Sequence, residues 1–237
     1  MDEKFYIGGK HAVFNAVNNH NRNVHQIYIT NANEQENIKF KNIKIVDSKF
    51  FNKIFKNTNL NHQNCAALVS PIKNYTLKDE INNNLNKLVI LNGVSDQRNI
   101  GSIIRTVLAL GFDGIILEKK FFNQKNPIMI KATSGAIEYL KIFSVSNIKN
   151  EIKILKKNNY QVVGLDSNSK KELTSFERTN KIALVFGSED KGIKNNVLKN
   201  CDETLKIPMN KKIKSLNVSN TVAATLGIIK FVENLNK

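Results

Sequence analysis

The stretch K-L-V-I-L-N-G-V-S-D-Q-R-N-I-G-S-I-I-R-T-V-L-A-L-G, Lys87 to Gly111, joins an apolar run to a polar loop and a helical segment. The run Leu88–Leu91 has the length and continuity of a buried strand. A helix that starts in the turn Asn99–Gly101 would end at Gly111, a residue type favoured just after helices. The stretch therefore predicts one strand-loop-helix unit.

The same alternation of predicted strands and helices continues to the C-terminus. Further apolar runs occupy residues 114–117, 161–165 and 181–187, and segments with helical periodicity lie between them. Alternation of buried strands and helices is typical of a parallel sheet covered on both faces. Residues 87–237 are thus expected to form an α/β domain around a mostly parallel sheet.

The beginning of the chain has a different pattern. Residues 8–13 lead into a short helix, and residues 24–29, 43–46 and 66–69 have strand-like patterns. Residues 1–71 are therefore expected to form a small α/β domain of their own. Residues 72–86 are polar and rich in Asn, which predicts a linker.

Composition points to a basic protein. The 237 residues carry a net charge of +16, of which residues 87–237 contribute +12 and residues 1–86 contribute +4. Lysine contacts to phosphate release counterions, so a nucleic acid is the leading explanation for this charge. A general enrichment in lysine, unrelated to binding, is the alternative.

The sequence disfavours secreted, membrane-spanning, metal-binding and several nucleotide-binding classes of protein. The start of the sequence lacks a signal-peptide pattern, no apolar run reaches membrane-spanning length, and Cys65 and Cys201 are far apart, so a cytoplasmic location is expected. All four histidines precede residue 63 and form no ligand cluster with the cysteines, so no metal is expected. Neither a G-x-G-x-x-G fingerprint nor a G-x-x-x-x-G-K-[ST] loop occurs, which disfavours dinucleotide-dependent dehydrogenases and P-loop nucleotidases.

Polar residues gather after the first predicted strand of the larger domain. Ligands of open α/β sheets lie at the carboxyl ends of strands. Asn99, Arg98 and Arg105 follow Leu88–Leu91, and Arg105 is expected about one turn inside the helix. The chain has only four arginines, so their presence here suggests a need for the planar guanidinium fork. Ordinary surface ion pairs are the alternative for both.

Two more polar loops follow later strands. Gly187 ends an apolar run and would allow another molecule to approach its backbone. Glu189 and Asp190 follow it, and capping of the next helix is the alternative to a site role for either. The third loop runs from Ile207 to Asn220, and one of its residues Asn217 and Ser219 is expected to cap the last helix.

Together these loops resemble the motifs of the SpoU family, also called TrmH, of RNA 2′-O-ribose methyltransferases. The first looks like N-x-G-x-x-x-R, the second like G-[small]-E-x-x-G and the third like I-P-M…S-L-N-V-S, with matching residues at Asn99–Arg105, Gly187–Gly192, 207–209 and Ser215–Ser219. Order and spacing agree over residues 87–237. One departure is Gln97, which stands where the family usually has proline.

The resemblance implies a fold, a cofactor and a site. The fold would be a trefoil-knotted SPOUT domain with a parallel sheet, preceded by an L30e-like RNA-binding domain, in a homodimer. The cofactor would be S-adenosyl-L-methionine (AdoMet), held by backbone groups of Gly187, Ile207 and Leu216. The catalytic residues would be Asn99, Arg105, Glu189, Ser215 and Asn217.

The N-terminal segments 6–13 and 62–64 are similar to one subgroup, which methylates a guanosine ribose in the peptidyl-transferase P loop of 23S rRNA. His11, His62 and Arg98 would contact RNA, although ordinary loop histidines are the alternative for the first two. A tRNA guanosine methyltransferase, an adenosine-methylating antibiotic-resistance enzyme and a non-catalytic RNA-binding or ribosome-assembly protein remain open.

Overall fold

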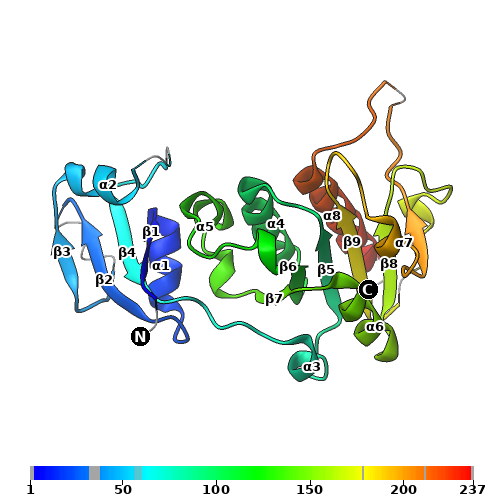
Figure 1. Ribbon diagram of the computed structural model, residues 1–237, viewed down its shortest axis with the longest axis horizontal. Coiled ribbons are helices and arrows are strands. Elements are labelled where there is room, and N and C mark those ends of the chain that lie inside the picture. The colour runs from blue at the N-terminus through cyan, green and yellow to red at the C-terminus, as the bar shows by residue number, and fades with distance from the viewer. Residues whose placement is uncertain are drawn as a thin grey trace. The chain divides into compact units, whose positions relative to one another are not determined.

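The chain forms two compact units (Figure 1). The computed structural model describes residues 3–31, 38–56, 58, 60–177, 179–210 and 212–235. The first unit consists of Met1–Lys73 and Asn123–Tyr139, and the second of Asn74–Phe122 and Leu140–Lys237. The chain therefore passes between the units three times.

The second unit is built on a six-stranded parallel sheet in the order β10-β8-β9-β5-β6-β7, which confirms the predicted parallel α/β architecture. Its strands are β5 (Lys87–Asn92), β6 (Gly114–Glu118), β7 (Lys141–Val145), β8 (Gln161–Leu165), β9 (Ile182–Gly187) and β10 (Glu203–Leu205). Its helices are α3 (Leu77–Glu80), α4 (Gln97–Ala109), η2 (Lys119–Phe121), α6 (Ile148–Lys157), η4 (Leu173–Ser175), α7 (Asn195–Leu198) and α8 (Val218–Leu235).

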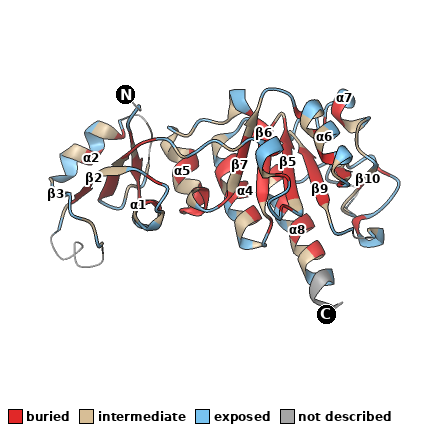
Figure 2. Cartoon of the chain, turned by 90° about the horizontal axis from the view of Figure 1, so that it is seen from below, coloured by how far each residue is buried: buried red, intermediate tan, exposed pale blue. Residues whose placement is uncertain are grey.

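Both faces of this sheet are covered, which explains why its strands are apolar without alternation. Leu88 and Ile90 pack on one face in a cluster with residues of α3, α6 and α7. Val89 and Leu91 are equally buried and point to the opposite face, where α4 and α8 pack on each other. Figure 2 shows the central strands in red along most of their length.

The strand order contains a topological switch. The chain runs outward from β5 through β6 to β7, then returns to β8 on the other side and pairs β9 with β5. The loops after β5 and β9 consequently diverge at the carboxyl edge of the sheet, which is where ligands bind in folds of this kind.

The first unit contains a four-stranded mixed sheet in the order β1-β4-β2-β3. Its elements are β1 (Phe5–Gly8), α1 (Lys10–Asn18), β2 (Val24–Ile29), β3 (Ile43–Ile45), α2 (Ser48–Ile54), β4 (Cys65–Val69), α5 (Pro127–Thr133) and η3 (Ala136–Glu138). Helix α2 packs Phe51 against Tyr28 and Ala66 of the sheet. The helix α1 packs against β1 and β4 and also contacts α5.

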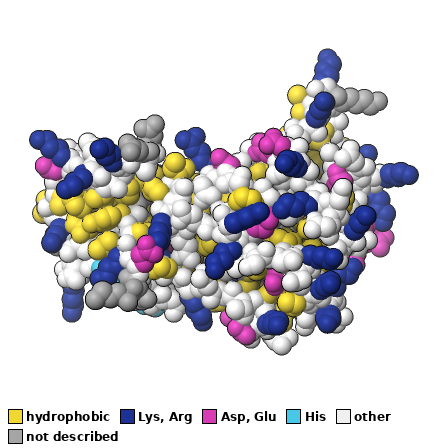
Figure 3. Space-filling view, viewed as in Figure 1, with side chains coloured by type: hydrophobic (Ala, Val, Ile, Leu, Met, Phe, Trp, Pro, Cys, Tyr) yellow, Lys and Arg dark blue, Asp and Glu magenta, His cyan; other side chains and the backbone are white. Residues whose placement is uncertain are grey.

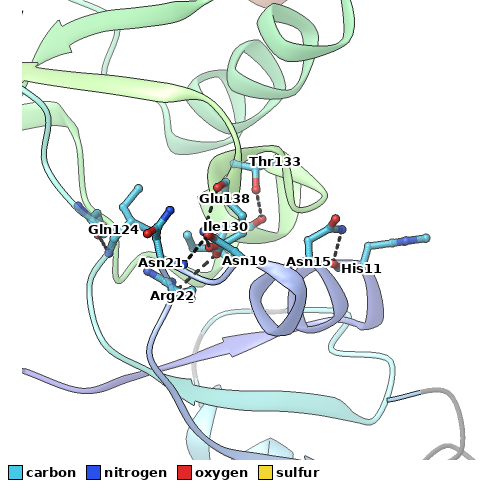
Figure 4. A network of polar contacts seen from close by, with 10 residues as sticks. His11, Asn15, Asn19, Asn21, Arg22, Gln124, Ile130, Thr133 and Glu138 are labelled. Atoms are coloured by element: carbon cyan, nitrogen blue, oxygen red, sulfur yellow. Dashed lines mark hydrogen bonds and ion pairs between the residues drawn. The ribbon is translucent and has the colours of Figure 1, made fainter. Parts of the chain in front are cut away.

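The segment 123–139 joins the first unit through buried polar contacts (Figure 4). The Asn19 amide donates hydrogen bonds to the backbone carbonyl and the carboxylate of Glu138. Arg22 Nε lies 3.5 Å from Glu138 Oε1, and both side chains are almost fully buried. Burial raises the pKa of Glu138 and lowers that of Arg22, while each charge partly offsets this effect on the other.

These boundaries differ from those expected from the sequence. Residues 123–139 fall inside the expected 87–237 domain, yet they pack with the first unit. Residues 74–86 belong to the second unit, because Leu77, Ile81 and Leu85 are buried in its core. The expected linker thus contributes apolar side chains at helical spacing, which its polar composition conceals.

Candidate active site at the carboxyl edge of the parallel sheet

Three loops meet at the carboxyl edge of the second unit's sheet. Asn99 lies in the first turn of α4, after β5; Glu189 follows β9; and Asn217 immediately precedes α8. Asn99 Nδ2 donates to Glu189 Oε1 over 3.0 Å, and Asn217 Nδ2 donates to Asn99 Oδ1 over 3.1 Å and also to Glu189 Oε1. The structure thus brings together three of the predicted catalytic residues.

Glu189 is the acceptor at the centre of this cluster. Its Oε1 also accepts from the backbone N–H of Val218 at 3.3 Å. The expectation that Glu189 or Asp190 could cap the next helix is wrong, because residues 188–193 form a turn and α7 begins only at Asn195. Glu189 therefore connects two other segments by hydrogen bonds and does not cap the start of α7.

The oxygen and the nitrogen of the Asn217 side-chain amide make different contacts. Its Oδ1 accepts from the backbone N–H and hydroxyl of Ser219 at 2.9 and 2.6 Å, which satisfies donors at the start of α8. Its Nδ2 faces Asn99 and Glu189. The prediction that Asn217 or Ser219 caps the last helix is confirmed for Asn217.

A cavity of about 500 Å³ opens beside these loops. Gly187, Ile207, Ser215 and Leu216, all predicted site residues, line it together with Glu189. Its wall combines apolar side chains such as Phe186 and Met209 with both kinds of charge, three carboxylates and three lysines. The charged residues are Asp166, Glu189, Asp190, Lys191, Lys206 and Lys214. A cavity with these properties suits an organic ligand that has apolar parts and charged groups of both signs.

Gly187 is required for a reason that the sequence did not reveal. A Cβ on this residue would lie 2.0 Å from the backbone carbon of Gly192 and 2.2 Å from Ile193 N. The close approach to the Gly187 backbone is thus made by the protein's own loop, which turns back so that Gly192 N donates to Ser188 O over 2.8 Å. The backbone of Gly187 still lines the cavity.

The predicted position of Arg105 needs correction. Helix α4 begins at Gln97, capped by the Asp96 carboxylate, so Arg105 lies eight residues beyond the first helical residue. That separation is about 12 Å along the axis, more than two turns and not one. Arg105 is exposed and is not among the residues that line the cavity. Arg98 is likewise exposed, in the first turn of α4.

The two predicted RNA-binding histidines lie in the first unit. His11 is exposed on α1, and Figure 4 shows its side chain extending away from the Asn19–Glu138 contacts. His62 is half-buried and stacks on Phe51, with ring centroids 4.9 Å apart. Burial and the charge of Lys131 lower the pKa of His62, so the neutral ring is favoured at physiological pH.

Two further residues near the catalytic cluster had no motif to indicate them. Glu118 is buried at the end of β6 and forms an ion pair with Lys194 at 3.1 Å. An acidic residue that ends an apolar strand was the available signal for Glu118.

Within the described residues, no group of three or more His, Cys, Asp or Glu side chains could hold a metal ion.

Comparison with known proteins identifies the family. Residues 86–227 match the model of the SpoU rRNA Methylase family. The chain belongs to the SpoU methylase family. It is 34% identical over 234 residues to a TrmH family tRNA/rRNA methyltransferase of Staphylococcus aureus (strain MSSA476), with 94% of each chain covered. A relative in Staphylococcus saprophyticus is 32% identical, with 94% of this chain and 93% of the relative covered.

Solved structures of methyltransferases share the fold. AviRb of Streptomyces viridochromogenes, in complex with AdoMet, has a TM-score of 0.83 at 21% identity, covering 97% of this chain and 90% of that one. An AdoMet-bound rRNA methyltransferase of Sinorhizobium meliloti has a TM-score of 0.79 at 20% identity, covering 94% of this chain and 85% of that one.

In the described part of this chain, no helix is both long and apolar enough to cross a membrane.

Proposed function

We propose that this SpoU family protein transfers a methyl group from AdoMet to the 2′-oxygen of an RNA ribose. The observation that carries the proposal is the hydrogen-bonded cluster of Asn99, Glu189 and Asn217, which come from three segments and of which Glu189 lines the cavity. Each of these residues stands in a separate family motif, so their convergence has a functional explanation in addition to a structural one.

The cavity fits AdoMet by size and chemistry. The backbones of Gly187, Ile207 and Leu216 would hold the cofactor, and the apolar wall would accept its adenine. The cavity wall carries carboxylates and lysines, and AdoMet carries a sulfonium, an ammonium and a carboxylate group that they could pair with. When bound, the cofactor supplies an activated methyl group, and the reaction needs no metal.

The protein's own residues would position the ribose and stabilise charge. An in-line displacement gains much of its rate from orientation, which Asn99, Asn217 and Ser215 would supply with their hydrogen-bonding groups. Arg105 would stabilise the developing alkoxide and the adjacent phosphate, because a guanidinium is a strong donor and a poor base. Its exposed position leaves it accessible to RNA and to a second copy of the chain.

The favoured substrate is the guanosine of the 23S rRNA P loop, in the cytoplasm, with tRNA as the alternative. The charge of +16 supports a polyanionic substrate, and Figure 3 shows lysine and arginine side chains distributed over the second unit. The first unit would be an L30e-like RNA-binding domain in which His11 and His62, together with Arg98 of the other unit, contact RNA. The second would carry the trefoil knot and form the homodimer.

The test is incubation with methyl-labelled AdoMet and either unmodified large-subunit rRNA or tRNA, followed by mapping of the labelled nucleotide. We expect label at one guanosine of the 23S P loop. Label in tRNA alone would show that the substrate is tRNA and would leave the proposed reaction unchanged. Binding of RNA without any transfer would contradict the proposal in favour of a non-catalytic RNA-binding protein.

A further inference from the structure

The loop between β5 and α4, residues 93–96, and the first residue of α4 each form a hydrogen bond with the segment 118–121, which contains the last residue of β6 and η2. Gly93 donates its backbone N–H to the Glu118 carboxylate. Gln97 donates its side-chain amide to the backbone carbonyl of Phe121 over 2.8 Å, as well as to that of Ser95 over 3.0 Å. Both ties lie within a few residues of Asn99.

Glu118 connects this loop to the loop that carries Glu189. Its Oε1 lies 3.1 Å from Lys194 Nζ, and its side chain is only 10% exposed. A second link runs in parallel, because the buried Asn92 accepts a 2.9 Å hydrogen bond from Lys194 N. A buried carboxylate is costly unless it is paired, so the contacts with Gly93 and Lys194 offset the cost of burying Glu118.

The orientation of the Gln97 amide is well defined. Both atoms near its Nε2 are carbonyl oxygens, which require a donor. Among the described residues its Oε1 is buried and has no hydrogen-bond partner. The side chain thus leaves one acceptor unsatisfied while it holds the loop at two points, an arrangement that stability alone does not favour.

We infer that the β6 end, residues 118–121, positions Asn99 in the catalytic cluster, with Gln97 and Glu118 as positioning residues. This inference rests on the proposed function of the cluster. Gln97 would hold the start of α4 in the orientation that lets Asn99 reach Glu189. Glu118 would keep the loops of Asn99 and Glu189 in register through Gly93 and Lys194.

The backbone offers an independent way to hold the same loop. Gln97 is the first residue of α4, a position where proline is well tolerated because the N–H has no partner within the helix. Asp96 has φ −67° and ψ 123°, a conformation compatible with a following proline. Proline at residue 97 would therefore restrict the loop by its ring and without the amide.

The experiment measures turnover and AdoMet affinity for wild type, Gln97→Ala, Gln97→Pro and Glu118→Gln. We expect Gln97→Ala and Glu118→Gln to lower kcat about tenfold, since small misplacements of reacting groups are costly, with AdoMet Kd changed less than about twofold. Gln97→Pro should recover most of the activity that Gln97→Ala loses. Gln161→Ala is the matched control, because Gln161 makes two side-chain hydrogen bonds at the opposite end of the sheet.

Hydrogen exchange of residues 93–99 provides a readout that does not depend on activity. We expect faster exchange in Gln97→Ala than in wild type, and recovery of protection in Gln97→Pro. The inference is overturned if Gln97→Ala keeps wild-type kcat and protection, or if Gln97→Pro is as impaired as Gln97→Ala. Absence of methyl transfer by wild type would defeat the proposed function instead, and the exchange data would still test the loop restraint.

Discussion

One carboxylate oxygen organises the candidate site at the residue scale. Oε1 of Glu189 accepts from Asn99 at the start of α4, and from Asn217 and the backbone of Val218 at the start of α8, so one acceptor joins its own loop to two other segments. Such an arrangement holds the polar groups in place before any ligand binds, which reduces the reorganisation that catalysis requires.

Replacement of Arg105 by lysine tests the role of the guanidinium fork. Arg105→Lys keeps the positive charge and loses the planar pair of donors, so we expect turnover to fall about tenfold or more. AdoMet affinity should change little, because Arg105 does not line the cavity. Steady-state kinetics and calorimetry measure the two effects. Near-normal turnover of Arg105→Lys would show that the fork is not needed.

His62 predicts a pH dependence of stability. Burial, with the Lys131 charge adding to it, lowers its pKa from an ordinary value of 6.5. The unfolded chain therefore binds a proton more readily, so the stabilisation is complete above that value and is lost as the pH falls through the folded-state pKa. We expect His62→Phe, which keeps a ring beside Phe51, to lose less stability than wild type between about pH 7.5 and about pH 5.

Urea denaturation at the two pH values measures this difference. The control is His20→Phe, since His20 is exposed. Equal pH dependence in wild type and His62→Phe would refute the assignment.

At the scale of elements, Asn217 both caps the start of α8 and donates its side-chain amide to Asn99 and Glu189. Asn217→Ser should keep the cap and remove the amide donors, whereas Asn217→Ala should remove both. We expect both variants to lose turnover, and only Asn217→Ala to lose about 1 kcal/mol of unfolding free energy. Thermal unfolding and methyl transfer, measured together, separate the two functions. Full turnover by Asn217→Ser would leave capping as the only function of the residue.

The elements that the sequence predicts are those with a continuous local signal. Strands β5, β6, β8 and β9 coincide with apolar runs, and the three motif loops follow strands of that sheet. The strand β7 was missed because only two of its five residues, Ile142 and Phe143, are buried. The packing of residues 123–139 with the first unit depends on contacts such as Asn19 to Glu138, 119 residues apart. Periodicity reports burial along an element, and it does not report which distant elements bury one another.

The same limit applies to the site. Asn99, Glu189 and Asn217 could be predicted because each stands in a motif. Gln97 and Glu118 were not assigned to the site, because their contacts join segments that are distant in the sequence.

At the scale of the whole molecule, the proposed homodimer has a candidate contact on α8. Phe231 is 65% exposed and Val232 is 42% exposed, an unusual pair of adjacent apolar side chains at the surface. We expect Phe231→Glu to weaken self-association about tenfold or more, because it places a charge in an apolar contact. Sedimentation velocity over a concentration series measures this effect.

The matched control for self-association is Phe14→Glu, at a residue of α1 that is 49% exposed in the first unit. An unchanged dimer in Phe231→Glu would remove this end of α8 from the interface, and a monomeric wild type would contradict the dimer itself.

The central claim is that a site built from three motif loops methylates a ribose oxygen of RNA. A 2′-O-methyl group blocks alkaline cleavage at its own nucleotide, so the chemistry can be read directly from the labelled product. After reaction with methyl-labelled AdoMet and complete alkaline hydrolysis of the RNA, the account predicts label in alkali-resistant dinucleotides, and none with Asn99→Ala. Label in mononucleotides, which would indicate methylation of a base, would contradict it.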